Sequence, residues 1–238
     1  MRHRVAGHDN FCTLGSTLAK TTTTKEADFY HNLENYPQYK EYTVECYNIK
    51  DKQEIDSNKQ EKQEINKKDK VIFLENLIYR MEKPAIMDIK LGVKNYRDDA
   101  DINRIAKNII KTHISTSAKL GLRIAGYQYW DNETLIKKDK HNCREFNQQR
   151  LTHTLHNFLP AGLLAIVKGN IEQILNSLTQ HHTFRLYGSS LLIIYDTKNP
   201  IETLEVRLID FSNYYKLKDP NDQDDGFIFG LTNLYNLF

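Results

Sequence analysis

Residues 84–92 read Pro-Ala-Ile-Met-Asp-Ile-Lys-Leu-Gly, and this nonapeptide is the most informative stretch of the chain. Apolar residues fill its alternate positions, and Asp88 and Lys90 stand between them. Successive side chains of a strand point to opposite faces, so these two charged groups share one face, about 7 Å apart. Pro84 can begin a strand, and Gly92 lets the backbone turn away. The pattern predicts a buried strand that offers a carboxylate and an ammonium to a ligand; the structural alternative is a half-exposed strand.

Composition limits the class of protein. The chain has 238 residues, 39% of them hydrophobic, which is enough for one core or for two lobes around a cleft. No apolar run approaches the roughly 18 residues of a membrane span, and the first residues do not resemble a secretory signal. Three cysteines, Cys12, Cys46 and Cys143, lie far apart, which disfavours a disulfide framework and a zinc site. We expect a cytoplasmic or nuclear protein that is reduced and monomeric, has no membrane span and, with a net charge of +2, binds no nucleic acid.

The order of the expected elements indicates an α+β fold. Residues 51–70 are almost wholly polar, with Ile55 and Ile65 as the only apolar residues, and predict a mobile loop. Helical and strand patterns then follow in mixed order, which favours two unequal lobes. We place the N-terminal lobe at residues 1–80 and the C-terminal lobe at 81–238. The chain has no G-x-x-x-x-G-K-[ST] segment, which argues against a P-loop fold.

A cationic helix is expected over residues 96–113, beginning near a pair of aspartates. Arg104, Lys107 and Lys111 are spaced i, i+3 and i+7, so they share one face. The isoleucines of this helix fall elsewhere and are expected to pack inward. A basic stripe is usually a solvated face, but it also suits a substrate with several phosphates, each of which accepts charge-assisted hydrogen bonds. Downstream, residues 184–195 and 206–211 are expected to form strands.

Several motifs together resemble one enzyme family. The P-x-x-x-D-x-K-x-G pattern of residues 84–92 is similar to the signature of the inositol polyphosphate kinases. Further segments resemble that family's S-T-S-x-x-L-G-x-R-x-x-G-x-Q, S-S-L-L, I-D-F and D-G-F-I-F-G-L motifs, in family order: residues 115–128, 184–196, 206–212 and 225–231. The first of these looks most like the hexakisphosphate kinases. The resemblance covers most of residues 71–238.

The resemblance implies an α+β, two-lobed, protein-kinase-like (ATP-grasp-like) fold with antiparallel sheets and helices, and an enzyme that uses ATP and Mg²⁺. Asp88 would hold the ribose hydroxyls, and Lys90 would bridge the donor phosphate and the acceptor. Asp210 would bind the metal, with Ser190 supplying a hydroxyl to metal-bound water or phosphate. Taken alone, Asp210 could equally cap a turn, and the Ser190 hydroxyl could bond to backbone. No general base is obvious, which phosphoryl transfer tolerates because positioning and electrostatics supply most of the rate.

Other residues of the nucleotide site follow from the same resemblance. Lys20 precedes the helix Glu26–Tyr30, which matches an E-x-x-F-Y pattern, and is the candidate phosphate-binding lysine. Lys25 is expected to face solvent. Glu75 and Leu77 end the strand that leads into residues 84–92, where the family places a hinge that contacts adenine.

The acceptor site is expected beside a helical segment at about residues 95–116. Its candidate ligands are Lys90, Arg104, Lys107, Lys111 and His113. Lys140 and Arg144 resemble the ends of a K-x-x-G-R segment, but Cys143 stands where glycine is usual. That departure leaves the roles of both cations open.

The resemblance predicts phosphorylation of inositol hexakisphosphate to a diphosphoinositol polyphosphate. The alternative is an inositol polyphosphate multikinase that phosphorylates ring hydroxyls of tris- and tetrakisphosphates, or an enzyme of mixed specificity. A non-enzymatic alternative is an inactive relative that only binds inositol phosphates. The retention of Asp88, Lys90, Ser190 and Asp210 argues against it.

Overall fold

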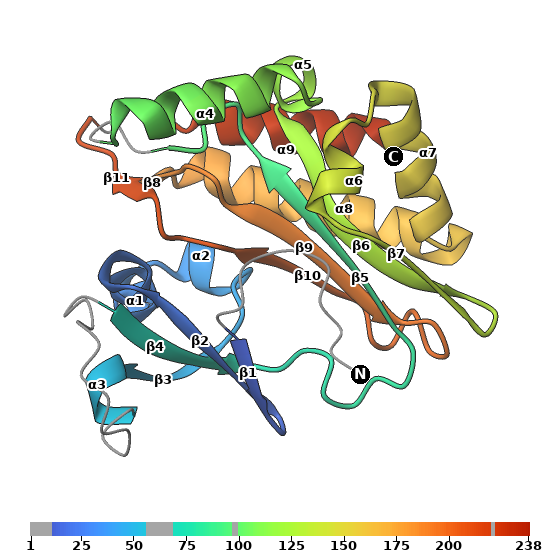
Figure 1. The fold of residues 1–238 in the computed structure, drawn as a ribbon, viewed down its shortest axis with the longest axis horizontal. Coiled ribbons are helices and arrows are strands. Elements are labelled where there is room, and N and C mark those ends of the chain that lie inside the picture. The colour runs from blue at the N-terminus through green and yellow to red at the C-terminus, as the bar shows by residue number, and fades with distance from the viewer. Residues whose placement is uncertain (1–10, 56–68, 97–99, 220–221) are drawn as a thin grey trace.

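Antiparallel sheets dominate the described part of the chain, which in the computed structural model comprises residues 11–55, 69–96, 100–219 and 222–238. One sheet has the strand order β1-β2-β4-β3, a second has the order β10-β9-β5-β6-β7, and β11 pairs with β8 (Figure 1). The strands are β1 (Phe11–Leu14), β2 (Thr17–Thr23), β3 (Cys46–Asp51), β4 (Asp69–Glu75), β5 (Pro84–Leu91), β6 (Leu122–Asp131), β7 (Thr134–Lys138), β8 (Phe184–Leu186), β9 (Ser190–Asp196), β10 (Glu205–Ile209) and β11 (Tyr214–Lys216). These sheets, together with the helices, confirm the predicted α+β class.

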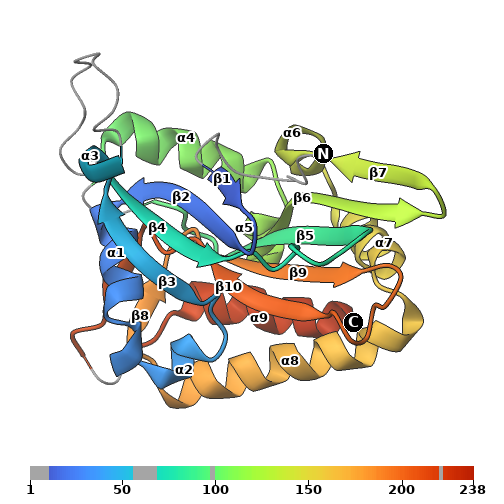
Figure 2. The ribbon, with the colours of Figure 1, turned by 90° about the horizontal axis from the view of Figure 1, so that it is seen from below.

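Helices pack against both of the larger sheets and around their edges (Figures 1 and 2). They are α1 (Thr24–His31), α2 (Pro37–Lys40), α3 (Lys52–Ile55), α4 (Ile102–His113), α5 (Ser117–Leu120), α6 (Lys140–Arg144), α7 (Gln148–Phe158), α8 (Ala161–Gln180) and α9 (Asp225–Leu237), with a 3₁₀ turn at Leu33–Asn35. In α8, Leu163, Val167, Ile171, Ile174 and Leu178 are buried at helical spacing, so one stripe of this helix joins the core. Among the described residues no single helix is long and apolar enough to cross a membrane. The helices α7 and α8 have sufficient length and apolar composition only when they are taken together, and the chain bends by 112° between them.

β5 is the central strand of the second sheet, between β9 and β6. All of its residues are buried except Lys90, which is half-buried, so the strand predicted from residues 84–92 is confirmed. The register places Lys90 opposite Ser190 on β9 and opposite Arg123 on β6. Directly opposed residues of antiparallel strands point to the same face. The sheet therefore presents these three side chains together.

The polar stretch 51–70 is more regular than predicted. Asp51 ends β3, Lys52–Ile55 forms α3, and Lys70 lies in β4. Asp51 pairs with Lys70 in the β3–β4 register, and its Oδ1 lies 2.9 Å from the Lys70 Nζ. This cross-strand ion pair and the ladder keep both ends of the stretch in the sheet. Residues 56–68 lie outside the described residues, and the division into lobes at residue 80 stays a prediction.

Two predicted elements have different bounds. The helix expected over 96–113 begins only at Ile102, because the Asp101 carboxylate caps it by accepting from the Asn103 and Arg104 N–H groups. The aspartates expected at its start, Asp98 and Asp99, lie outside the described residues. The strand expected over 184–195 is two strands in different sheets.

The break in that second element has a local cause. Gly188 has a φ of 74°, a left-handed conformation that turns the chain between β8 and β9. β8 therefore pairs with β11, while β9 enters the second sheet beside β5. The turn also brings the Gly188 carbonyl oxygen to 2.8 Å from the Lys90 Nζ.

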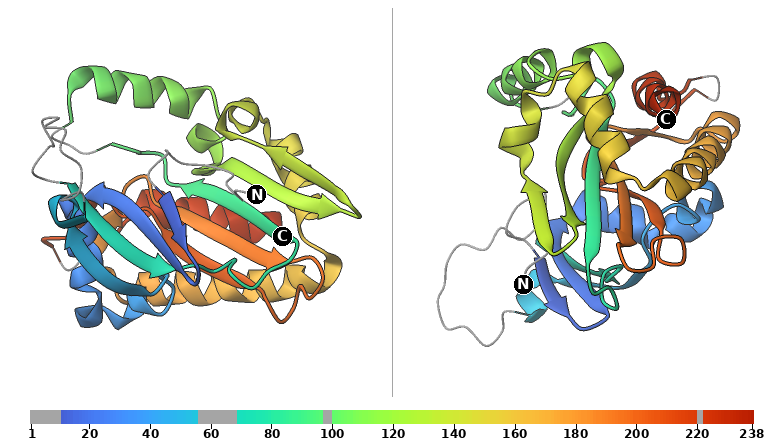
Figure 3. Two further views of the ribbon diagram at one scale, coloured as in Figure 1. Left: turned by 60° about the horizontal axis from the view of Figure 1, so that its bottom comes forward. Right: turned by 90° about the vertical axis from the view of Figure 1, so that its right-hand side faces the viewer.

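Of the isoleucines of α4, Ile105 is half-buried but Ile102, Ile109 and Ile110 are exposed, so the prediction that they pack inward is wrong for these three. Ile102 is 77% exposed and Ile110 is 60% exposed, and no residue of α4 is buried. The helix lies along the outer edge of the molecule, beyond the end of β5 (Figure 3). Its amphipathic pattern is real, but the protein provides no core beneath its apolar side.

Three glycines allow α9 to approach the end of β5. The Gly92 N–H donates to the Gly121 carbonyl oxygen at 2.7 Å, and a Cβ on Gly230 would lie 2.1 Å from that same oxygen. A gap of this size admits only glycine, because backbone lies on both sides of the contact. The contact fixes the residues that follow Lys90.

We expect Gly230→Ala to lower the free energy of unfolding by about 2 kcal/mol or more, because the new methyl group forces apart two backbone segments. Urea unfolding followed by circular dichroism measures the effect. Gly169→Ala is the matched control: Gly169 lies in α8 with open space around its Cβ position, so alanine there should raise the free energy of unfolding by about 0.5–1 kcal/mol. Equal effects at both positions would contradict this account of the contact.

Candidate functional site

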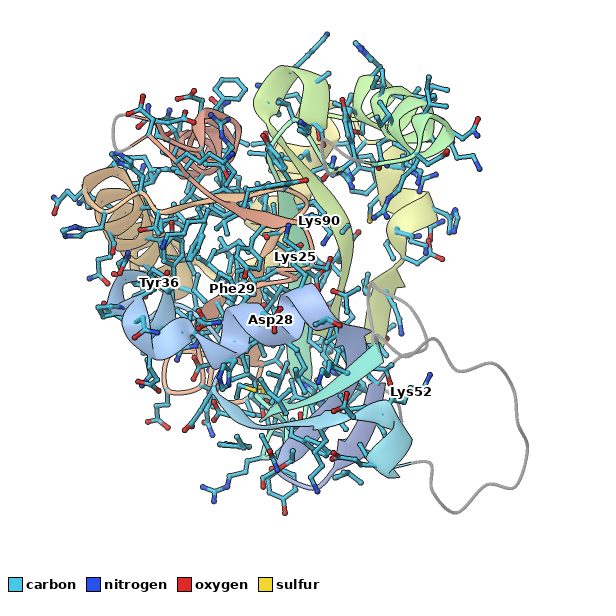
Figure 4. All side chains as sticks on the ribbon, turned by 90° about the vertical axis from the view of Figure 1, so that its left-hand side faces the viewer. Lys25, Asp28, Phe29, Tyr36, Lys52 and Lys90 are labelled. Atoms are coloured by element: carbon cyan, nitrogen blue, oxygen red, sulfur yellow. The ribbon has the colours of Figure 1, made fainter. Side chains whose placement is uncertain are left out.

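Asp210, the residue after β10, lies between two lysines that come from different sheets. Its Oδ1 is 3.0 Å from the Nζ of Lys20 on β2, and its Oδ2 is 2.5 Å from the Nζ of Lys90 on β5. The Lys90 ammonium also donates to the Gly188 carbonyl oxygen. One carboxylate thus joins the two sheets by charge. Figure 4 labels Lys90 together with Lys25, Asp28 and Phe29 of α1.

Asp210 adopts a strained backbone conformation. Its φ is 67°, in the left-handed region, which aspartate tolerates better than most residues but which still costs free energy. Two hydrogen bonds hold it there: the Ser189 hydroxyl donates to the Asp210 carbonyl oxygen at 2.8 Å, and the Phe211 N–H donates to the Glu26 carboxylate at 3.2 Å. This conformation ends β10 and points the carboxylate at the two lysines.

Glu26 is a site residue whose role the sequence did not reveal. Its buried carboxylate accepts from the Lys20 ammonium at 2.7 Å, from the Thr22 hydroxyl and from the Phe211 N–H. Helix α1 supplies it, and the Thr23 hydroxyl caps that helix by accepting from the Glu26 N–H. Phe29, one turn further along α1, stacks on Phe211 with ring centroids 4.0 Å apart. Glu26 is the glutamate of the E-x-x-F-Y pattern, and this pattern is the sequence feature that could have identified it as a site residue.

The site strongly perturbs proton affinities. Burial alone would raise the pKa of Asp210, but the Lys90 and Lys20 ammonium groups hold it well below its usual range. Burial would lower the pKa of Lys20, but Asp210 and Glu26 raise it well above its usual value. The pKa of Asp88 is raised, chiefly by burial and also by the nearby charge of Asp210, against the opposing effect of Lys90. At neutral pH the Asp210 carboxylate is therefore ionised and the Lys20 ammonium is charged.

Asp88 and Ser190 contribute oxygen atoms to the same face of the sheet as Lys90. Both residues are buried, and Asp88 Oδ1 and Ser190 Oγ lack a well-formed hydrogen bond. Buried polar atoms of this kind indicate a ligand that supplies the missing hydrogen bonds or coordination. Together with the Asp210 carboxylate they offer hard oxygen donors, which suit a divalent cation such as Mg²⁺ or the hydroxyls of a sugar.

The protein supplies only part of a metal ion's ligands at this site. Within the described ranges, no group of three or more His, Cys, Asp or Glu side chains could hold a metal ion. Mg²⁺ commonly keeps one or two protein carboxylates and takes its other ligands from phosphates and water. The donor set of Asp210 and Ser190 fits that mode of binding.

The predicted nucleotide residues lie at the junction of the sheets. Glu75 ends β4, and its N–H donates to the Glu45 carbonyl oxygen at 2.9 Å. Leu77 is half-buried against the core in the segment that leads to β5. The adenine-contacting roles of both residues stay predictions. Lys25 is not a purely solvent-facing residue: it is half-buried, with its Nζ 4.0 Å from the ring centroid of Tyr215.

A pocket of about 400 Å³ lies on the cationic side of α4 and is lined by Asn95 and by the helix. Arg104, Lys107 and Lys111 line it, so the structure brings these three predicted residues together. His113 does not line the pocket. It is two residues beyond Lys111 and therefore roughly 200° further around the helix.

Arg123 is a second site residue that the sequence interpretation missed. It projects from β6 beside Lys90, and its Nη1 donates to the buried Ser117 hydroxyl at 3.0 Å. Burial lowers the pKa of its guanidinium group, the nearby Asp88 carboxylate opposes that shift, and Arg144 adds to it. The arginine of the L-G-L-R segment was visible in the sequence, but its position opposite Lys90 depends on strand register.

Further cations converge between α4, β6 and α6. The pKa of Lys111 is lowered, first by burial and then by the positive charges of Arg144, Arg123, Lys107 and Lys140. Lys140 and Arg144 belong to α6, which begins with a capping box between Asp139 and Asn142. Cys143, at the position where glycine is usual in the family motif, is buried in the core. Concentrated positive charge of this kind suits a ligand with several phosphates.

We expect Asp210→Asn to lower the free energy of unfolding at pH 7 by about 1–2 kcal/mol, because the charge that binds both ammonium groups is lost. Because the folded-state pKa of Asp210 lies below the unfolded value of about 3.9, this stabilisation is present above about pH 4 and disappears as pH falls through the folded-state pKa. Urea unfolding at several pH values checks it: the gap between wild type and variant should narrow below about pH 4. The exposed Asp131→Asn is the control, and a gap that widens in acid would contradict this assignment.

Comparison with known proteins places the chain in a family. The inositol polyphosphate kinase family model matches residues 71–238. Inositol hexakisphosphate kinase 3 of Mus musculus is 30% identical over 201 residues, covering 72% of this chain and 51% of that protein. Inositol hexakisphosphate kinase 2 of Rattus norvegicus is 35% identical over 145 residues, covering 57% of this chain and 34% of that protein. The chain spans about half the length of the first of these relatives.

A solved structure shares the fold. The crystal structure of the inositol phosphate multikinase Ipk2 from S. cerevisiae, in complex with ADP and Mn²⁺, matches with a TM-score of 0.77 at 19% identity and covers 94% of this chain and 98% of that one. The similarity confirms the predicted two-lobed kinase fold class. The matched family model, the fold and the motifs agree, and this chain belongs to the inositol polyphosphate kinase family.

Proposed function

We propose that this protein transfers a phosphoryl group from ATP to inositol hexakisphosphate and forms a diphosphoinositol polyphosphate. The observation that carries the proposal is the position of Lys90. Its ammonium contacts Asp210 on one side. On the other side, Arg123 lies opposite Lys90 on the neighbouring strand and belongs to the group of cations that also includes residues of α4 and α6. The similarity to hexakisphosphate kinases supports the acceptor, and the neighbour solved with ADP and Mn²⁺ supports the donor.

In this proposal the nucleotide lies between the two sheets. Lys20 binds its phosphates, Asp88 accepts from the ribose hydroxyls, and the segment with Glu75 and Leu77 contacts adenine. Asp210 and Ser190 hold Mg²⁺, which when bound would neutralise charge on the nucleotide phosphates. Glu26 keeps the Lys20 ammonium in place through its 2.7 Å contact.

Lys90 holds the transferred group and the acceptor together. Phosphoryl transfer has a loose transition state, so a fixed cation and correct alignment supply most of the rate. A phosphate oxygen of the acceptor is already largely ionised near neutral pH, because its second pKa is about 6. Inositol hexakisphosphate therefore needs no general base to attack, which matches a site whose charged groups are chiefly cations.

The second candidate is a multikinase that phosphorylates ring hydroxyls of less phosphorylated inositols. The pocket beside α4 favours it to some extent, because one exposed helix forms most of its lining and could admit acceptors of several sizes. The similarity to a multikinase structure concerns the fold and does not favour this acceptor over the hexakisphosphate.

Turnover with purified protein, ATP, Mg²⁺ and inositol hexakisphosphate tests the proposal. We expect wild type to release ADP and form a diphosphoinositol product, and Asp210→Asn to lower kcat by about 100-fold or more, since the metal ligand and the partner of both lysines are lost. Asp131→Asn should match wild type. Turnover only on tris- or tetrakisphosphates would support the multikinase, and binding without turnover would support the inactive relative.

The acceptor side is tested separately. We expect Lys111→Ala and Arg123→Ala to raise the KM for the inositol phosphate by about 10-fold or more, because each removes a charge-assisted bond to phosphate. The KM for ATP should change less than about 2-fold. Lys137→Ala, an exposed lysine on β7 outside the cationic cluster, is the matched control. If the KM for ATP rose as much as the KM for the inositol phosphate, these residues would not be assigned to the acceptor site.

A further inference from the structure

Helix α4 displays a row of isoleucines to the outside. Ile102, Ile109, Ile110 and the following Ile114 are 77%, 42%, 60% and 55% exposed. Such large apolar side chains usually lie in a core, and a contiguous exposed patch of them marks an interaction surface. We call these four residues the isoleucine face.

The contacts of α4 explain why this face is open. Its half-buried residues, Ile105, Asn108 and Thr112, are spaced i, i+3 and i+7, so the helix rests on that side. The Thr112 hydroxyl donates to the carbonyl oxygen of Val93 at 3.3 Å, which ties the end of the helix to the chain after β5. Figures 1 and 3 both show the opposite side of α4 at the surface of the molecule. The isoleucine face is therefore available to a partner.

Apart from Asp101, which caps its N-terminus, α4 and the segment after it carry charges of one sign. The sequence contains no aspartate or glutamate from residue 102 to residue 130. In the same stretch it has five cations: Arg104, Lys107, Lys111, Lys119 and Arg123. Lys107 precedes Ile110 by three residues and Ile114 by seven, so a cation borders the isoleucine face directly.

These charges decide what can cover the face. A second copy of the chain would bring one cationic helix against another, and like charges in contact cost free energy. A partner peptide docks most often in an apolar groove, whereas α4 is a single convex helix. A helix with an apolar face beside lysines and arginines, and low overall hydrophobicity, is typical of segments that lie in the plane of an anionic bilayer.

We propose that α4 docks on anionic phospholipid bilayers. The isoleucine face enters the boundary between headgroups and acyl chains, and cations at its border meet the lipid phosphates and carboxylates. Docking of this kind needs no membrane span. The isoleucines do not line the acceptor pocket, so the proposal does not rest on the proposed kinase activity, although Lys107 lies both in that pocket and at the border of the isoleucine face.

Sedimentation with lipid vesicles tests the proposal. Wild type should bind vesicles of phosphatidylcholine with about 30 mol% phosphatidylserine at least about 10-fold more tightly than vesicles of phosphatidylcholine alone, and added salt should weaken the binding. Ile109→Glu combined with Ile110→Glu should lower binding to the anionic vesicles by about 10-fold or more. The uncharged pair Ile109→Gln and Ile110→Gln should also weaken it, which separates lost apolar contact from charge repulsion.

The matched control is Ile201→Glu, at an isoleucine that is 64% exposed in the turn between β9 and β10. This variant should bind vesicles as wild type does, and circular dichroism should show that all variants keep their fold. Three results would overturn the proposal: wild type that does not bind anionic vesicles, equal binding by the α4 double variants, or an equal loss in Ile201→Glu. Sedimentation velocity without lipid adds a fourth: self-association of wild type that the α4 substitutions abolish would assign the face to contact between copies.

Discussion

The ion pairs of Asp210 with Lys20 and Lys90 are the interaction on which the site depends. Two lysines near one another repel, and half-buried charges lose hydration, so the arrangement is stable only because a carboxylate lies between them. β2, β5 and the end of β10 each supply one member. The Glu26 carboxylate also accepts a hydrogen bond from the Lys20 ammonium, and it accepts another from the N–H of Phe211, the residue after Asp210. One network thus positions the oxygen proposed to bind the metal and the two cations proposed to bind phosphate.

The proposed acceptor side is different, because it concentrates charge of one sign instead of pairing opposite charges. Burial and then the charges of Arg144, Arg123, Lys107 and Lys140 lower the pKa of Lys111, and burial and Arg144 lower the pKa of Arg123. Repulsion between these cations opposes folding. Proteins retain such unfavourable arrangements where function requires them. A polyphosphate would relieve the repulsion, which makes the cluster a better indicator of the ligand than any single cation in it.

Helix α4 shows how far an amphipathic pattern can be trusted. The spacing of its cations predicts a shared face, and Arg104, Lys107 and Lys111 do line one pocket. The same periodicity predicts that its isoleucines pack inward, yet all of them except the half-buried Ile105 are exposed. Periodicity reports which residues share a side of a helix; whether the rest of the protein covers that side depends on contacts made elsewhere. The late start of the helix at Ile102 has the same origin, since the Asp101 cap depends on local backbone geometry.

Local sequence patterns are sufficient to predict the α+β class, the strand β5 with Asp88 and Lys90 on one face, and the family to which the chain belongs. These features rest on local alternation and on short motifs, which residues close together in the chain encode. The tertiary structure was needed to show that Asp210 contacts Lys20 and Lys90, which lie 190 and 120 residues away. It was also needed to show that Arg123 lies opposite Lys90 and that Glu26 completes the network. It also decided that Gly188 divides one apparent strand into two. Strand register and packing bring distant residues together, and no local pattern in the chain specifies them.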